Sequence, residues 1–192
     1  MEKSFGKTNT AVFISGRGSN LSSLIKYSKT KKSLIRIALV ITDNSDAKGL
    51  EYAKKSKINN IFIKYSDRES FENRALKLLK KNNIDLICLA GFMKILSRKF
   101  ITNVYRPILN IHPSLLPKYR GLNTHNRAIL NKEKYSGATV HIVNDKLDSG
   151  KIILQEKVKI LKSDSVNSLK KKVLKIEHKI YPKAIIKLLT NY

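Results

Sequence analysis

The sequence predicts an α/β fold built on a largely parallel sheet. Two observations carry this prediction: short apolar, β-branched runs recur along the chain, and the segments between them place apolar residues at three-and-four spacing with lysines opposite. Such alternation is typical of strands connected by covering helices. The predicted strands span residues 10–15, 34–42, 60–64, 85–92, 107–113, 138–143 and 151–160. The predicted helices between the early strands span residues 21–29, 48–56 and 68–82.

The early strands are apolar almost throughout, as expected for strands that helices cover on both faces. The last two runs lie only a short loop apart, which predicts an antiparallel pair at the sheet edge. A final helix is expected to begin after Ser163 or Asp164, either of which can cap it. Pro182 is expected to bend or restart this helix. The apolar stripe of the helix consists of Val166, Leu169, Val173, Ile176 and Ile180.

Length and composition predict a single domain covering residues 1–192. The chain is of ordinary domain size, and it shows no internal repeat, Pro/Ser-rich linker or shift in composition. No apolar run approaches the roughly 18 residues of a membrane helix, and the N-terminus lacks the layout of a secretory signal. We therefore expect a cytoplasmic protein with no membrane partner. Cys88 is the only cysteine, so an internal disulfide is excluded, and it is interpreted as a small buried hydrophobe.

The chain is strongly basic, with 39 Lys plus Arg against 14 Asp plus Glu and a formal charge of +25. Such a charge attracts polyanions over a long range, so a nucleic-acid-binding module is one alternative. However, the lysines are dispersed along the chain, and no aromatic-rich basic strand suited to base stacking is present. We interpret most of the charge as solvated surface that in part steers phosphorylated or carboxylate-rich small substrates. No specific nucleic-acid partner is expected.

A candidate anion site follows the first predicted strand directly, in the sequence SGRGSN at residues 15–20. Two glycines allow a tight turn and close approach of the backbone to a ligand, and the helix that follows favours an anion at its N-terminus. The pattern lacks the third glycine of the dinucleotide fingerprint and the Lys-Ser/Thr of a P-loop. An ordinary strand-to-helix turn capped by Ser19 or Asn20 is the competing interpretation.

Asn110, His112 and Asp148 form a candidate catalytic constellation. Asn110 and His112 are two residues apart at the end of a predicted strand, so they project to one face at the edge where parallel sheets bind ligands. The imidazole exchanges protons near neutrality, and an amide can donate to an oxyanion, which together suit attack of an amine on a carbonyl carbon. Asp148 lies in the loop between the two late strands, and its carboxylate is expected to raise the pKa of the imidazole.

The other histidines receive simpler interpretations. His141 alternates within a strand and is expected to be a hydrogen-bonded core or edge residue. His178 lies in the lysine-rich final helix and is expected to be exposed. His125 either lines the site or starts a helix. No pair of histidines has metal-ligand spacing with a nearby acid, so no metal is predicted.

The chain resembles the phosphoribosylglycinamide formyltransferase family through motifs that run along nearly all of its length. The pair HPSLLP and downstream LDxG is shared by the wider formyltransferase superfamily, whereas SGxGSN narrows the resemblance to the glycinamide enzymes. Relatives often have Pro-Gly and a histidine within residues 119–123, which leaves Arg120 and Asn123 without a role. The motifs are SGRGSN, LAGFMKILS, NIHPSLLPKYRG, GATVH, LDSGKIILQ and EHKIYP.

The resemblance implies a Rossmann-like, three-layer fold whose seven-stranded sheet is mostly parallel with an antiparallel edge. It also implies transfer of a formyl group from 10-formyltetrahydrofolate, a co-substrate, to the amine of phosphoribosylglycinamide in purine synthesis. In this mechanism Asn110 and protonated His112 would stabilise the oxyanion of a tetrahedral intermediate, and Asp148 would hold the imidazole. The partners are small molecules, and the protein is expected to act as a monomer or homodimer.

The resemblance further implies which residues bind the two substrates. The implied ligands of phosphoribosylglycinamide are Gly18, Ser19, Asn20 and Glu177. The implied folate contacts are Arg68, Met93, Lys94, Ile95, Leu96, Asn110, Asn144, Asp145, Lys146, Leu147 and Asp148.

Two other formyl-group enzymes compete with this interpretation. Formyltetrahydrofolate deformylases share the folate site, but they usually carry an N-terminal regulatory domain. The first predicted strand begins near Thr10, which is expected to leave no room for such a domain. Methionyl-tRNA formyltransferases fit the positive charge, but they carry an extra C-terminal domain, and the GSN phosphate loop argues against them. We therefore expect the glycinamide enzyme.

Overall fold

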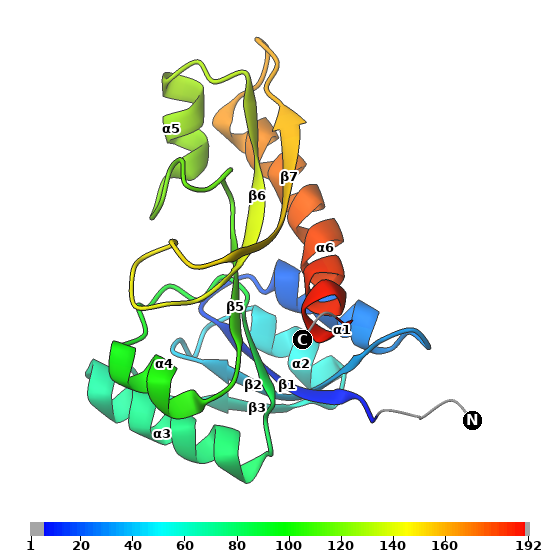
Figure 1. The fold of residues 1–192 in the computed structure, drawn as a ribbon, viewed down its shortest axis with the longest axis vertical. Coiled ribbons are helices and arrows are strands. Elements are labelled where there is room, and N and C mark those ends of the chain that lie inside the picture. Colours follow the sequence, from blue (N-terminus) through cyan, green and yellow to red (C-terminus); the bar gives the residue numbers. More distant parts are fainter. Residues whose placement is uncertain (1–5, 191–192) are drawn as a thin grey trace. The chain divides into compact units, whose positions relative to one another are not determined.

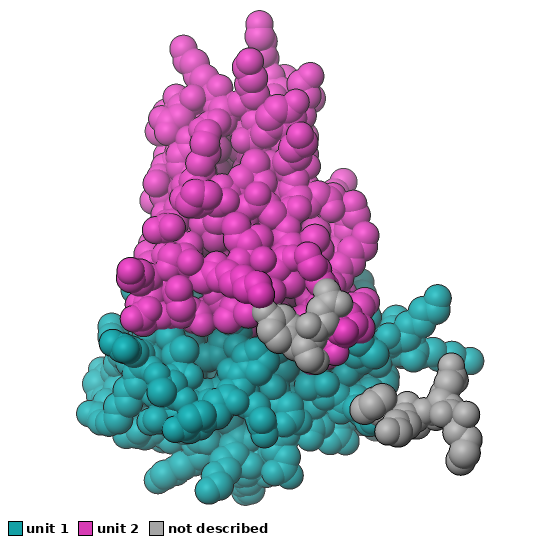
Figure 2. All heavy atoms as spheres, in the orientation of Figure 1, with its two compact units in different colours: residues 1–108 teal, residues 109–192 magenta. Residues whose placement is uncertain are grey.

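The computed structural model describes residues 6–190, which fall into two compact units with their boundary between Ile108 and Leu109 (Figures 1 and 2). Unit 1 contains β1 (Thr8–Ile14), α1 (Ser19–Ser28), β2 (Ile35–Thr42), α2 (Gly49–Lys55), β3 (Asn59–Phe62), α3 (Arg68–Lys81), β4 (Leu86–Leu89) and α4 (Arg98–Val104). Strand β5 (Ile108–His112) begins on the last residue of unit 1. Unit 2 continues with α5 (Thr124–Leu130), β6 (Tyr135–Ile142), β7 (Ile152–Lys159) and α6 (Val166–Thr190).

The strands form one seven-stranded sheet in the order β3-β2-β1-β4-β5-β6-β7. The pairs of β1 with β2, β1 with β4 and β2 with β3 are parallel, whereas β5 with β6 and β6 with β7 are antiparallel. This confirms the predicted α/β fold with a mostly parallel sheet and an antiparallel edge. The edge is larger than the single pair expected from the sequence, because α5 and its flanking loops return the chain antiparallel to β5.

Unit 1 has a core of central strands and aromatic rings. Residues Ala11–Ile14 of β1 are completely buried, which explains why this strand is apolar on both faces. The ring of Phe13 packs edge-on against Phe92, with centroids 5.4 Å apart, and Phe71 stacks on Phe92 at 5.6 Å. Helix α1 contacts α2, and α3 contacts α4. The apolar stripes of these helices therefore complete the core around the sheet.

In unit 2, helix α6 packs along β6 and β7 (Figure 1). The predicted stripe of α6 is buried at Leu169, Val173, Ile176 and Ile180. Fully buried Tyr181 donates its hydroxyl to the Leu109 carbonyl at 3.1 Å. The helix thus anchors the first residues of the unit as well as its hairpin.

The structure corrects two expectations about α6, its N-cap and a restart at Pro182. The N-cap is Ser165, whose Oγ accepts from the Ser168 N–H at 3.1 Å, and not Ser163 or Asp164. Asp164 instead accepts from the Leu161 N–H and pairs with Lys172. Pro182 lies inside one continuous helix and does not restart it, because the buried residues on either side hold both halves in the core.

His178, expected to be exposed, is half-buried. Within residues 6–190, no helix combines the length and the apolar character that crossing a membrane requires.

Candidate functional site

The predicted phosphate loop lies in unit 1 between β1 and α1. Gly18 is the N-cap of α1 and adopts a left-handed backbone with φ of 72°, and no side chain caps this end. Ser19 and Asn20 lie inside the first turn, so the interpretation of either residue as the cap was wrong. Because first-turn N–H groups have no acceptor within the helix and lie at the positive end of its dipole, this end of α1 suits an anion.

The glycines of the loop are required by a close approach of two backbones. A Cβ on Gly18 would lie 2.4 Å from the Cα of Gly49, at the start of α2. The Gly49 N–H donates to the Gly16 carbonyl at 3.0 Å. Main-chain contacts therefore fix the position of the loop against α2.

The segment Met93–Leu96, predicted to contact folate, is tied to the same loop through Ser15. The Ser15 N–H donates to the Gly91 carbonyl at 3.1 Å, and its Oγ accepts from the Met93 N–H at 2.9 Å. Met93 and Ile95 are 63% and 55% exposed, so large apolar side chains stand free beside the phosphate loop. Leu96, in contrast, is buried in the core.

Two predicted folate residues of unit 1 carry positive charge. Lys94 lies 3.7 Å from the Asp43 carboxylate and 4.6 Å from the centre of the Tyr65 ring. Arg68 is the exposed first residue of α3. Unit 1 thus combines a turn suited to an anion, exposed apolar side chains and two cations.

Unit 2 brings the predicted catalytic trio together. The Nδ1 of His112 lies 3.3 Å from Oδ2 of Asp148, and both side chains are more than nine-tenths buried. The Nδ2 of Asn110 lies 3.4 Å from Oδ1 of the same carboxylate. The Gly121 N–H donates to Oδ2 of Asp148 at 2.8 Å. One buried carboxylate therefore contacts both polar side chains of β5.

His141 is a fourth member that the sequence interpretation placed in the core only. It is buried, as expected, and its Nε2 lies 3.2 Å from Asn110 Nδ2 and 3.7 Å from Asp148 Oδ1. Its Nδ1 lies 3.0 Å from the Ile142 carbonyl, which only accepts, so Nδ1 carries the hydrogen and neutral Nε2 accepts from Asn110. Asn110 and His141 are direct partners in the β5–β6 register. Only that register, which no local sequence pattern indicates, reveals the contact.

Burial sets the protonation of the site. Burial lowers the pKa of His112, against the opposing effects of the Tyr119 carbonyl and Asp148, and the charges of His141 and Arg127 lower it further. Asp148 does favour the protonated form of His112, as expected, but desolvation outweighs the carboxylate, so the net shift in the pKa of His112 is downward.

Burial pushes the pKa of Asp148 up, but the neighbouring His141 imidazole, the hydrogen bond from the Gly121 N–H and the charge that His112 carries when protonated bring this pKa below its ordinary value. At neutral pH the site therefore pairs a neutral imidazole with an ionised carboxylate.

The proton of neutral His112 is assigned by its partners. Both ring nitrogens face acceptors: Nε2 lies 2.8 Å from the Tyr119 carbonyl, and Nδ1 lies 3.3 Å from the Asp148 carboxylate. Because the Nε2 contact is the shorter one, we assign the single hydrogen of the neutral ring to Nε2. Nδ1 is then the basic nitrogen, and it faces Asp148. After Nδ1 takes up a proton, both N–H groups of the imidazolium have an acceptor.

The remaining predicted residues of unit 2 lie on two elements. The loop of residues 144–148 folds back on itself, since Asn144 Oδ1 accepts from the Lys146 N–H at 3.1 Å and from Ser149 Oγ at 3.0 Å. Asp145 and Lys146 are exposed in this loop, as is Leu147, which is 50% exposed. Glu177 is buried on α6. The loop therefore presents an apolar side chain immediately before Asp148.

His125 is the second residue of α5 and is half-buried. Its Nδ1 has no hydrogen-bond partner within residues 6–190. Burial, followed by the charges of Lys170 and His112, lowers the pKa of His125 to about 4. At neutral pH it is therefore an uncharged imidazole, and it lies close enough to His112 for a charge on His112 to disfavour its protonation.

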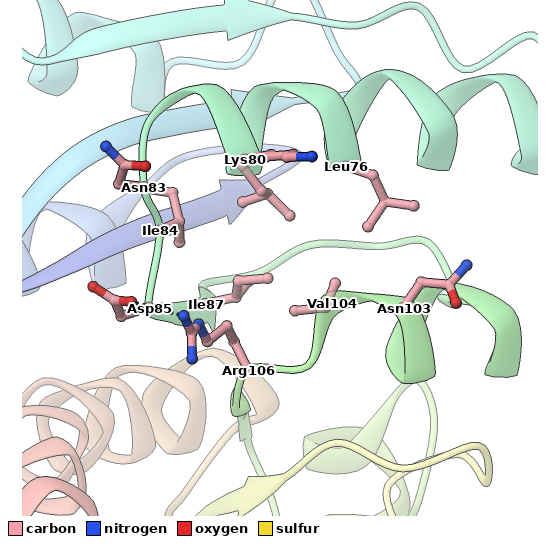
Figure 3. A pocket seen from close by; sticks show the side chains of 10 residues that line it. Leu76, Lys80, Asn83, Ile84, Asp85, Ile87, Asn103, Val104 and Arg106 are labelled. Atoms are coloured by element: carbon pink, nitrogen blue, oxygen red, sulfur yellow. Dashed lines mark ion pairs between the residues drawn. The ribbon is translucent and has the colours of Figure 1, made fainter.

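A cavity of about 510 Å³ lies elsewhere in unit 1, between the C-terminal ends of α3 and α4 (Figure 3). Ile84, Ile87 and Val104 line it together with Lys80 and Arg106. It lies at the amino-terminal end of β4 and includes none of the predicted site residues. Within residues 6–190 no group of three or more His, Cys, Asp or Glu side chains could hold a metal ion.

Comparison with known proteins places these sites in a family context. A family model described as formyl transferase matches residues 8–185. The chain is 41% identical to the phosphoribosylglycinamide formyltransferase of Escherichia coli, over 92% of this chain and 85% of that protein. It is 42% identical to the Haemophilus influenzae protein of the same name, over 91% and 84% of the two chains.

The chain is also 40% identical to a trifunctional purine biosynthetic protein of Bos taurus. That match covers 93% of this chain but only 18% of the relative. The chain thus corresponds to a minor part of the trifunctional relatives.

Solved structures agree with the sequence matches. A phosphoribosylglycinamide formyltransferase from Anaplasma phagocytophilum matches with a TM-score of 0.87 at 41% identity, over 92% of this chain and 84% of that one. The Bacillus halodurans protein of the same name matches with a TM-score of 0.91 at 34% identity, over 95% of both chains.

The close approach at Gly18 generates a first prediction. Gly18→Ala should lower the free energy of unfolding by more than about 1 kcal/mol, because the left-handed backbone disfavours a Cβ and Gly49 occupies its space. Gly16→Ala is the matched control, since a Cβ at Gly16 meets nothing within 4 Å. Urea unfolding of both variants measures the difference, and equal stabilities would contradict the close contact.

The environment of His125 generates a second prediction. Because its pKa is about 4 in the folded protein and about 6.5 in the unfolded chain, the unfolded chain binds more protons between these values. Stability should therefore fall as pH decreases from 6.5 to 4. His125→Asn should reduce this slope in urea unfolding measured across the interval, leaving the part due to His112. An unchanged slope would show that His125 titrates alike in both states.

Proposed function

Because this chain belongs to the formyl transferase family, we propose that it transfers a formyl group from 10-formyltetrahydrofolate to the amine of phosphoribosylglycinamide in purine synthesis. The family implies a folate-type formyl donor; the 10-formyl compound and a metal-free reaction are our proposal. The observation that carries it is the buried His112–Asp148 pair beside Asn110. It offers a neutral base and an ionised carboxylate, as transfer to an amine requires.

Substrate binding is proposed for the residues that match the family motifs. Gly18, Ser19 and Asn20 would hold the phosphate, for which the first turn of α1 is suited, and Glu177 would contact the ribose. Folate would contact Arg68 and the segment Met93–Leu96 in unit 1, and Asn110 with the loop 144–148 in unit 2. Exposed Met93, Ile95 and Leu147 support this, because they offer apolar surface to a flat ring system.

The chemistry proposed for His112 is proton uptake. The folate donor supplies the formyl carbon, which the glycinamide amine attacks to form the new C–N bond. The amine must lose a proton in this step, and Nδ1 of His112 is neutral and able to take it, directly or through a water. Asp148 then stabilises the imidazolium on one side and the Tyr119 carbonyl does so on the other. When the bond between the formyl carbon and the folate nitrogen breaks, the imidazolium can return its proton to that nitrogen, and tetrahydrofolate leaves.

Asn110 is proposed to donate to the developing oxyanion. In the structure its Nδ2 faces two acceptors, His141 at 3.2 Å and Asp148 at 3.4 Å. The contact with Asp148 is the longer and therefore the weaker of the two. We expect Asn110 to give up this contact and to donate the same hydrogen to the oxyanion. A preorganised donor of this kind contributes roughly 10²- to 10³-fold in rate.

The domain organisation, the location and the oligomeric state are also proposed. The family match runs from residue 8 to residue 185 and so includes both units, which supports their acting as one catalytic domain. We place the protein in the cytoplasm as a monomer or homodimer that acts on small molecules.

Steady-state transfer tests this function directly. With 10-formyltetrahydrofolate or its dideaza analogue, folate product should form only when phosphoribosylglycinamide is present, and no formate should be released. Formate release that ignores the ribonucleotide would identify a hydrolase instead. Activity in neither assay, together with binding to generic DNA or RNA that persists at physiological salt, would favour the nucleic-acid-binding alternative.

Asp148→Asn separates catalysis from binding. The variant should lower kcat by about 10²- to 10⁴-fold, the range of positioned proton transfer, and change the dissociation constant for phosphoribosylglycinamide only slightly. Asp46→Asn, an exposed carboxylate of unit 1, is the control. Equal losses in turnover and affinity, measured by kinetics and calorimetry, would instead indicate a structural Asp148.

A further inference from the structure

We propose that Arg127 is a positioning residue that holds the loop of residues 118–123 against the catalytic pair. The proposal rests on the proposed function, because it assigns a role within that site. None of the family motifs includes this arginine, and it lies on α5, outside the strand and the loop that carry the trio.

The loop 118–123 touches the catalytic pair with two main-chain atoms. The Tyr119 carbonyl accepts from His112 Nε2 at 2.8 Å, and the Gly121 N–H donates to Asp148 at 2.8 Å. The first contact fixes which nitrogen of His112 is basic, and the second helps keep Asp148 ionised. A shift of this loop would therefore alter both members of the pair at once.

The backbone of the loop is in a sparsely populated conformation. Tyr119 and Asn123 have φ of 58° and 57°, in the left-handed region that disfavours residues other than glycine. Gly121 has φ of 76°. Such conformations persist where surrounding contacts hold them. The position of the loop therefore depends on residues outside it.

Arg127 supplies contacts on both sides of Gly121. Its Nη1 donates to the Arg120 carbonyl at 2.7 Å and to the Leu122 carbonyl at 3.4 Å. Its guanidinium lies over the Tyr119 ring, 5.0 Å from the ring centre. One side chain thus contacts three residues of the loop.

The other side of the loop has a separate anchor. The Tyr119 hydroxyl donates to Glu133 at 2.8 Å, and Lys118 pairs with the same carboxylate at 2.9 Å. This anchor holds the start of the loop, whereas Arg127 holds the residues that flank Gly121. Loss of Arg127 should therefore loosen the part of the loop next to Asp148 without releasing the whole loop.

The charge of Arg127 acts on His112 as well. The charged or titratable neighbours that influence His112 are Asp148, which favours its protonation, and His141, Arg127 and His125, which oppose it. The kinetic readout must therefore be the pH-independent maximum of kcat, which a shift in the pKa of His112 by itself does not move.

The test compares Arg127→Met, which removes charge and donors, with Arg127→Lys, which retains both. We expect R127M to lower the pH-independent maximum of kcat about tenfold, with the KM for phosphoribosylglycinamide changed less than twofold. R127K should recover the maximum to within about threefold. The control is Arg74→Met, an exposed arginine on α3, which should keep the unmodified kinetics.

A readout without substrate distinguishes this proposal from the proposed function. In NMR spectra at neutral pH, the Nε2–H of His112 should exchange slowly in the unmodified protein and in R127K, and at least tenfold faster in R127M. If R127M does not fold, R127Q replaces it, since it lacks the charge and the reach to both carbonyls. An unchanged kcat maximum and unchanged exchange, or equal losses in R127M and R127K, would overturn the role of Arg127.

Discussion

The buried carboxylate of Asp148 is the interaction on which the rest of unit 2 depends. It lies close to polar groups from three parts of the chain: Asn110 and His112 of β5, His141 of β6, and the Gly121 N–H, which donates to it. A buried anion is costly unless polar groups surround it. The loop before β7 brings it there through a left-handed backbone at Asp148 itself, with φ of 46°. The position of Asp148 therefore depends on strand pairing and on loop conformation, and its charge influences the protonation of the site.

The proximity of Asn110 and His112 could be predicted because simple geometry determines it. Two polar residues of alternate register end a buried strand, and the two-residue period of a strand places Asn110 and His112 on one face whatever surrounds them. The phosphate loop followed from two glycines between a strand and a helix, and the sheet from its apolar runs. In each case the pattern lies within a few consecutive residues, which is where sequence rules apply.

The features that could not be predicted depend on contacts between distant residues. His141 joins the trio only through the pairing of β5 with β6, and the pKa of His112 follows the depth of burial more than its carboxylate partner. The conformation of residues 118–123 is held by side chains further along the chain, and two of its left-handed residues are not glycine. Ser165 caps α6 because Asp164 is engaged elsewhere.

Many contacts that shape the two sites are made by main-chain atoms, among them the Tyr119 carbonyl, the Gly121 N–H and the bond between Gly49 and Gly16. A main-chain atom is present whatever side chain its residue carries. Surface positions can therefore carry lysine while these main-chain contacts keep their geometry. A formal charge of +25 is thus compatible with the two sites, whose main-chain contacts do not depend on it.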